Sequence, residues 1–195
     1  MPSTTHLLYL HGFRSSPQSA KARQTAAYVH QHHPQLTLWC PQLPPSPRAA
    51  MALVAQGIAT WPRESMAVMG SSLGGFYASW VAQQMACPSV MLNPAVDPAR
   101  DLAKYVGEQA SWHDPSDRFF FLPEYIAELQ TLDMRGRPPA GAELAIIAQG
   151  DEVLDWREMA QRYPAALQIV NAGGDHALSN FAEHLPQIAK FLALA

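Results

Sequence analysis

Short apolar runs alternate with longer amphipathic segments along most of the chain. Continuous apolar runs of strand length are typical of parallel strands that are buried on both faces of a sheet. We place such strands at His6–His11, Leu36–Cys40, Met66–Met69, Ser89–Asn93, Glu143–Gln149 and Ala166–Val170. The segments between them carry apolar residues at helical spacing. Strands that alternate with helices predict βαβ units, and therefore an α/β fold with about six parallel strands and helices on both faces.

Several helix boundaries follow from capping residues. Ser16 and Ser46 each precede a proline, which predicts an N-cap followed by proline at the first helical position. The first of these helices is expected to end near His30. The last helical segment contains Pro186, which is expected to kink that helix or divide it in two.

The alternation breaks between about residues 97 and 141. Here we expect a short helix to residue 106, a polar and turn-rich segment over 107–117, and a helix over 123–130. An insertion of this length between strands is commonly a lid or a binding element. Its aromatic residues are candidates either for lining an acyl pocket or for attaching the insertion to the body of the protein. They are Trp112, Phe119, Phe120, Phe121 and Tyr125.

Composition restricts the class of protein. A chain of 195 residues with 48% hydrophobic and 15% charged residues suits a single globular domain over 1–195, with residues 97–141 as its insertion. A formal charge of −3 with scattered Lys and Arg does not predict a nucleic-acid partner. No targeting segment or membrane span is predicted, and the two cysteines are expected to be free thiols, so we expect a cytoplasmic protein. No feature predicts an oligomeric state.

No cofactor is predicted either. His30, His32 and His33 resemble a metal cluster but have no carboxylate or cysteine at ligand spacing, so a solvated helix end is the favoured interpretation. The glycines at 70–75 are not followed by the Gly-Lys-Ser/Thr of a phosphate loop. The sequence therefore predicts no metal and no nucleotide or redox cofactor.

A candidate nucleophile lies at the end of the third predicted strand. Gly70-Ser71-Ser72-Leu73-Gly74 is a Gly-x-Ser-x-Gly pattern, the nucleophile elbow of α/β-hydrolases, in which a tight strand-to-helix turn excludes side chains two residues on either side of the serine. The two glycines satisfy this spacing for Ser72 but not for Ser71. A helical pattern follows the serine at Leu73, Phe76, Tyr77, Trp80 and Val81. The alternative is a tight glycine turn with an unreactive serine.

The loop after the first strand is the second candidate element. α/β-Hydrolases build half of their oxyanion hole in a loop of this kind, so we expect the backbone N–H groups of Phe13 and Leu73 to converge on a developing oxyanion. The preceding residue His11 is expected to fix this loop by hydrogen bonding, with a catalytic role as the alternative.

The acid and the base of a triad are expected in later loops. Asp151 comes directly after a strand, where open α/β sheets gather catalytic groups, whereas Asp155 has Glu158 three residues later and is expected to be an N-cap with a capping box. We therefore prefer Asp151 as the acid. His176 follows Gly173 and Gly174, and the chain order Ser, Asp, His is the order of this fold.

These motifs together resemble the YqiA-like esterases, small bacterial members of the α/β-hydrolase superfamily. The resemblance is carried by Leu8–Phe13, Ser15–Pro17, Pro41–Pro45, Gly70–Gly75, Asn93–Val96, Gly150–Asp155 and Gly173–His176. It implies a compact α/β-hydrolase fold with strand order 2-1-3-4-5-6, lacking the first two strands of the larger enzymes. It also implies esterase activity on acyl esters or thioesters, with Ser72 as nucleophile, His176 as base and Asp151 as acid.

Three functions follow from these observations. The first is a serine hydrolase that cleaves carboxylic acyl esters of small or medium size through a Ser-His-Asp triad and a covalent acyl-enzyme. The second is an acyl-CoA or acyl-carrier thioesterase that uses the same residues. The third is a non-catalytic relative that binds a ligand or a protein in its pocket.

Overall fold

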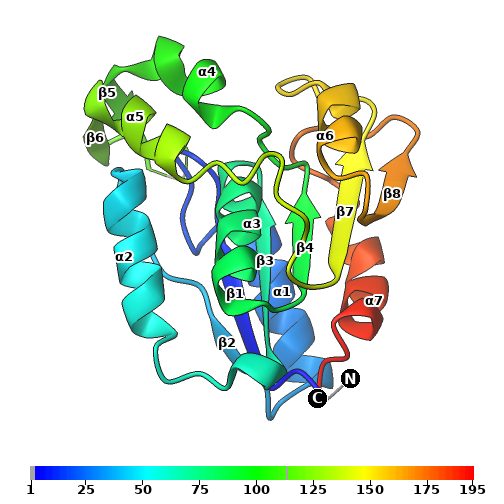
Figure 1. Ribbon diagram of the computed structural model, residues 1–195. Coiled ribbons are helices and arrows are strands. Elements are labelled where there is room, and N and C mark those ends of the chain that lie inside the picture. Colours follow the sequence, from blue (N-terminus) through cyan, green and yellow to red (C-terminus); the bar gives the residue numbers. More distant parts are fainter. Residues whose placement is uncertain (1–2, 113) are drawn as a thin grey trace.

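Six parallel strands form the main sheet of the computed structural model, which describes residues 3–112 and 114–195 (Figure 1). The strands are β1 (His6–Leu10), β2 (Thr37–Trp39), β3 (Met66–Ser71), β4 (Ser89–Leu92), β7 (Glu143–Ala148) and β8 (Leu167–Asn171). Their spatial order is β2-β1-β3-β4-β7-β8, and every neighbouring pair is parallel. This is the order 2-1-3-4-5-6 that the resemblance to the YqiA-like esterases implied, and it places β3 between β1 and β4.

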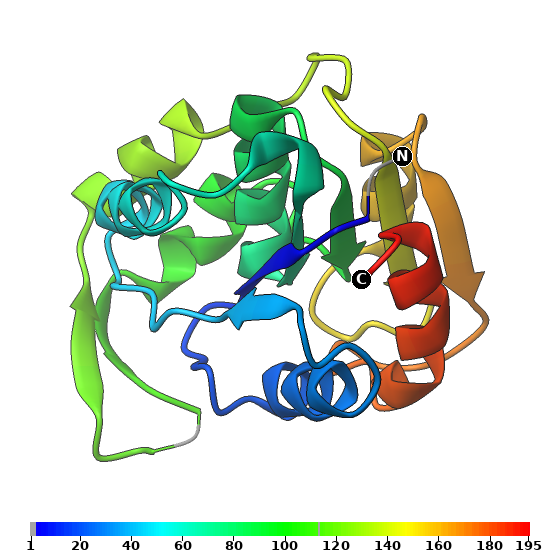
Figure 2. The ribbon, with the colours of Figure 1, turned by 90° about the horizontal axis from the view of Figure 1, so that it is seen from below.

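Helices cover both faces of this sheet, as Figures 1 and 2 show. α1 (Ala20–His32) and α7 (Phe181–Phe191) lie on one face. α2 (Pro47–Gly57), α3 (Leu73–Met85) and α6 (Trp156–Arg162) lie on the other, and a short 3-10 helix, η1 (Arg63–Ser65), precedes β3. Within the described residues, no helix combines the length and the apolar composition that a membrane crossing requires.

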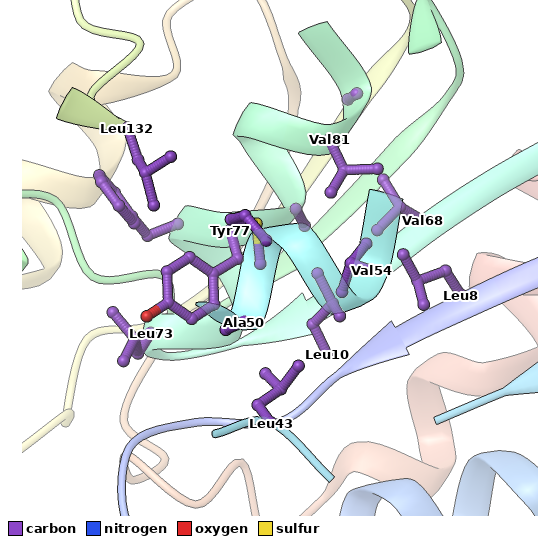
Figure 3. Close-up of a cluster of buried hydrophobic side chains, with 14 of the residues drawn as sticks. Leu8, Leu10, Leu43, Ala50, Val54, Val68, Leu73, Tyr77, Val81 and Leu132 are labelled. Atoms are coloured by element: carbon purple, nitrogen blue, oxygen red, sulfur yellow. The ribbon is translucent and has the colours of Figure 1, made fainter. Parts of the chain in front are cut away.

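The side chains of each central strand alternate between two buried clusters. Leu8 and Leu10 of β1 pack with Val68 of β3 against α2 and α3, and Figure 3 shows this cluster. Leu7 and Tyr9 face α1 and α7 instead. Because both faces are buried, the strands read as continuous apolar runs rather than as alternating patterns.

The insertion lies beyond the carboxyl ends of the strands (Figure 1). It contains α4 (Pro98–Leu102), the 3-10 helix η2 (Ala103–Tyr105), an antiparallel hairpin of β5 (Gly107–Ala110) and β6 (Arg118–Phe121), and α5 (Glu124–Thr131). The hairpin corrects the expectation of a turn-rich segment over 107–117. β5 is polar and only partly buried, so its strand conformation comes from pairing with β6 and leaves little hydrophobic pattern in the sequence.

Helix boundaries differ from the prediction at one end of α1. Ser46 caps α2 as expected, its Oγ accepting from the Ala49 N–H at 3.1 Å. In α1, however, the N-cap is Ser19 rather than Ser16, because residues 16–19 form a turn closed by the Ser19 N–H donating to the Ser16 carbonyl at 3.0 Å. Pro186 lies inside α7 without dividing it.

Candidate active site

Ser72 occupies a sterically constrained turn between β3 and α3. Its backbone has φ 56° and ψ −121°, a conformation that costs a residue with a side chain roughly 1–3 kcal/mol. A Cβ on Gly70 would lie 2.0 Å from the Gly74 carbonyl oxygen, and a Cβ on Gly74 would lie 2.0 Å from the Leu10 carbonyl oxygen. Both glycines are therefore required by the close approach of backbone, and the residue at the elbow is Ser72 rather than Ser71.

A chain of hydrogen bonds joins Ser72 to two residues from distant loops. Nε2 of His176 lies 3.1 Å from the Ser72 Oγ, and Nδ1 of His176 lies 2.7 Å from Oδ2 of Asp151. A neutral ring that donates from Nδ1 to the carboxylate leaves Nε2 as an acceptor for the serine hydroxyl. The structure thus brings together the three residues that the sequence singled out.

The loop after β7 fixes the Asp151 carboxylate. Oδ1 accepts from the backbone N–H groups of Val153 and Leu154, both at 2.8 Å, so that Oδ2 is left for His176. The Asp151 side chain has an exposed fraction of 0%, compared with 51% for that of Asp155.

Asp155 has the structural role that the sequence predicted. Its Oδ1 accepts from the Arg157 N–H at 2.9 Å and caps α6. The capping box is not formed, because Glu158 makes two hydrogen bonds to the Arg100 guanidinium of α4 instead, at 2.7 and 3.0 Å.

Asn93 supports the histidine loop and was not predicted as a site residue. This fully buried side chain accepts from the Ala148 N–H at 2.8 Å and donates to the carbonyls of Asp175 and His176 at 2.9 and 3.3 Å. Its φ of 40° is tolerated better by asparagine than by most residues. The signal in the sequence was a polar residue at the end of a wholly apolar strand, directly before a proline.

Replacing Asn93 with alanine is expected to lower the free energy of unfolding by about 3 kcal/mol. The change leaves a buried N–H and two carbonyls without their partner, and it keeps a positive φ on a residue that resists it. Urea denaturation measures the effect, with Asn180→Ala on the half-buried start of α7 as the matched control. Equal losses in the two variants would show that Asn93 does not anchor the loop.

The loop after β1 approaches the serine closely. A Cβ on Gly12 would lie 3.2 Å from the Cβ of Ser72. Leu73 is the first residue of α3, where helix N–H groups have no intrahelical acceptor, and within residues 3–112 and 114–195 the N–H groups of Phe13 and Leu73 have no protein acceptor. His11 accepts at Nε2 from the Leu43 N–H at 3.1 Å, in agreement with a loop-fixing role.

The same loop is attached to the β5–β6 hairpin. The Phe13 ring packs on Phe119 and Phe121, with ring centroids 6.0 and 5.2 Å away. The next residue, Arg14, donates from Nε to the Ala110 carbonyl at 2.6 Å, and its guanidinium carbon lies 4.2 Å from the centroid of the Trp112 ring. The backbone N–H of Trp112 in turn donates to the Arg14 carbonyl at 2.8 Å.

Two cavities reach both Ser72 and His176. One of about 410 Å³ is lined by Leu73, Leu102, Tyr105 and Leu154, and also by the charged residues Arg14, Asp101, Lys104 and Glu152. The other, of about 270 Å³, lies on the side of α1. A larger cavity of about 810 Å³ lies between α4, α6 and the segment before β7, and contains neither Ser72 nor His176.

The aromatic residues of the insertion have different environments, and on strand β6 successive side chains point to opposite faces. Trp112 lines both cavities at Ser72, and Phe119 lines a neighbouring cavity of about 600 Å³. Phe120 points outward with an exposed fraction of 63%, whereas Phe121 is 1% exposed and packs against Tyr125. Phe119, Phe120, Phe121 and Tyr125 line neither cavity at Ser72. For Phe119, Phe121 and Tyr125, which pack in the cluster under α2 and α3, this favours the alternative that they attach the insertion to the body. The residues missed were Tyr105 and Leu102.

In the described part of the chain, no three His, Cys, Asp or Glu side chains are grouped so as to hold a metal ion. Nδ1 of His33 lies 2.9 Å from the carbonyl oxygen of Ala195.

One protein family and several solved structures are similar to this chain. The model of an uncharacterised protein family, UPF0227, matches residues 6–193. The structure of mouse alpha/beta hydrolase domain-containing protein 10 has a TM-score of 0.73 at 14% identity, covering 98% of this chain and 91% of that one. Est1E from Butyrivibrio proteoclasticus has a TM-score of 0.67 at 12% identity, covering 98% and 86%. A structure from a description of LipS and LipT, two metagenome-derived lipolytic enzymes, has a TM-score of 0.71 at 16% identity, covering 97% of this chain and 94% of that one. The chain has the α/β-hydrolase fold.

Proposed function

We propose that this chain, which belongs to the YqiA-like family UPF0227, is a serine hydrolase that cleaves carboxylic acyl esters of small or medium size. One observation carries the proposal: the unbroken chain of hydrogen bonds from Ser72 through His176 to the buried Asp151, at a strained elbow. Strained backbone of this kind concentrates at functional sites. The solved structures of similar fold include lipolytic enzymes, which supports the reaction class.

In the proposed reaction His176 takes the proton of Ser72 as the Oγ attacks the ester carbonyl. The carbonyl oxygen becomes an oxyanion, which the N–H groups of Phe13 and Leu73 stabilise. His176 then gives its proton to the leaving alkoxide as the acyl-enzyme forms. Water, deprotonated by the same ring, attacks the acyl-enzyme and releases the acid and Ser72. Throughout, Asp151 holds the ring in the required tautomer and stabilises the imidazolium.

The acyl chain is assigned to the 410 Å³ cavity, because its wall carries the apolar residues Leu102, Tyr105 and Leu154. In this proposal the insertion over residues 97–141 acts as the lid of the site. Trp112, which lines both cavities at Ser72, is its contribution to the substrate wall.

Labelling with a fluorophosphonate probe tests the proposal. The probe reacts with activated serine hydroxyls, so the native protein and Ser71→Ala are expected to be labelled and Ser72→Ala is not. Native protein that is folded but remains unlabelled would favour the non-catalytic alternative. For labelled protein, the ratio of rates on matched oxygen esters and thioesters then decides between an esterase and a thioesterase.

A further inference from the structure

The second cavity at Ser72 is distinguished from the 410 Å³ cavity by the side chains of Tyr9 and Lys21, which line only the second. It has a volume of about 270 Å³, and its wall combines Ser72 and His176 with the polar residues Ser15, Ser19 and Lys21 and with Tyr9 of β1. Tyr9 faces the sheet side covered by α1, and Lys21 is the second residue of that helix. The acyl assignment to the 410 Å³ cavity leaves this space without a function.

The Tyr9 hydroxyl is a buried donor without an acceptor. The residue is 1% exposed, and its oxygen has no hydrogen-bond partner among the described residues. Burial raises the pKa of this phenol, so the hydroxyl keeps its proton. Buried polar groups are nearly always hydrogen-bonded in native proteins, and an unpartnered one beside a cavity indicates a missing ligand group.

Lys21 provides a positive charge at the same cavity. Its Nζ donates one hydrogen to the Ala177 carbonyl at 2.6 Å, and an ammonium group has two more to donate. Within the described residues, no carboxylate lies within ion-pair distance of it. The nearby Asp175 carboxylate accepts from the hydroxyl and the N–H of Ser179 instead. Burial lowers the pKa of Lys21 to about 8, against the smaller effects of Asp175 and Asp151, so the charge is present at pH 7.

We propose that the substrate carries an anionic group, a carboxylate or a phosphate, which binds in the 270 Å³ cavity to the Lys21 ammonium and the Tyr9 hydroxyl. This inference rests on the proposed function and narrows its substrate class to acidic esters. An anion there completes the hydrogen bonding of Tyr9 and pairs the charge of Lys21. It also lies beside Ser72 and His176, so the group fixes the position of the ester across the nucleophile.

A purely structural role for Lys21 makes a different prediction. If the side chain only holds the Ala177 carbonyl next to His176, its loss lowers turnover of every ester by the same factor. An anion site instead changes the ratio between acidic and neutral esters. The experiment therefore compares matched substrates at pH 7: 4-acetoxybenzoate with phenyl acetate, and mono(4-nitrophenyl) glutarate with 4-nitrophenyl pentanoate.

The native enzyme is expected to prefer the acidic member of at least one pair in kcat/KM. Lys21→Met is expected to lower kcat/KM for that member by about tenfold or more, the usual size of a lost charge-assisted hydrogen bond, with the neutral member changed less than about threefold. Tyr9→Phe is expected to reduce the same preference without lowering the Tm, since its hydroxyl has no hydrogen-bond partner among the described residues. Lys190→Met in α7, far from the cavity, is the control of equal charge change.

An unchanged ratio in Lys21→Met, or equal losses on both members of each pair, would overturn the inference. Calorimetric binding of 4-acetoxybenzoate and phenyl acetate to Ser72→Ala protein reads the anion site without turnover. Equal affinities for the two esters, or an affinity for 4-acetoxybenzoate that Lys21→Met leaves unchanged, also overturn it. Native protein that turns over neither member of either pair, by contrast, contradicts the proposed hydrolase activity itself.

Discussion

Ser72→Ala is expected to lower kcat on a neutral acyl ester by about 10⁶, the usual cost of removing a triad nucleophile. The residue provides the only atom that bonds covalently to the substrate in the proposed mechanism. The oxyanion donors and the cavities remain in the variant, so a small residual rate above the uncatalysed reaction is expected. Steady-state kinetics with 4-nitrophenyl butyrate measures the effect.

The neighbouring serine provides the control. Ser71→Ala removes a hydroxyl of the same kind one residue earlier, at the end of β3, and is expected to retain most of the turnover. Relief of backbone strain at φ 56° does not contribute to the effect of Ser72→Ala, because alanine at position 72 has the same steric conflict as serine. A fall of less than about 10³ for Ser72→Ala would be too small for a covalent mechanism and would contradict the proposal.

Asp151→Asn is expected to lower kcat by about 10⁴ while leaving the substrate affinity nearly unchanged. The amide keeps the size of the side chain, but its NH₂ group cannot accept a hydrogen bond. The pairing that holds the His176 ring in the tautomer with Nδ1 protonated is then lost. The measurement is kcat and KM on the same ester, together with circular dichroism to show that the loop after β7 still folds.

Asp155→Asn is the matched comparison, since both aspartates lie within five residues of each other. Asn is itself a good N-cap, so little change in turnover and at most about 1 kcal/mol in stability are expected. If turnover were lost in Asp155→Asn and retained in Asp151→Asn, the assignment of Asp151 as the acid of the triad would be wrong.

The strands and the elbow were predictable from the sequence for separate physical reasons, whereas the strand order came from the resemblance to the YqiA-like esterases. Strands such as β3 are buried on both faces, so their composition alone shows them. The elbow is shown by steric exclusion: a side chain at Gly70 or Gly74 would collide with backbone atoms, and few other turns require glycine at both places. Asp151 and His176 follow strands in a sheet whose carboxyl ends meet at one edge, so their proximity followed from the topology.

The remaining features depend on contacts between distant segments. Asn93 joins the end of β4 to the end of β7 and to the loop of His176, through hydrogen bonds to residues 55 to 83 positions away, which no local pattern records. β5 takes its conformation from β6. The apolar run Phe119–Phe121 indicated that the segment contacts the body of the protein, but not which of its side chains do so. The alternation between buried and exposed positions is known only from the register of the hairpin.

The attachment of Phe13 to the hairpin has a consequence for the divergence of this family. The residue whose side chain packs on Phe119 and Phe121 also carries one of the two N–H groups assigned to the oxyanion. Remodelling the hairpin for a new substrate therefore alters the support of a reacting group as well as the shape of the pocket. A hairpin grafted from a relative has to bring an aromatic surface that fits Phe13. A change in the hairpin is therefore expected to change substrate specificity and the rate of acyl transfer together.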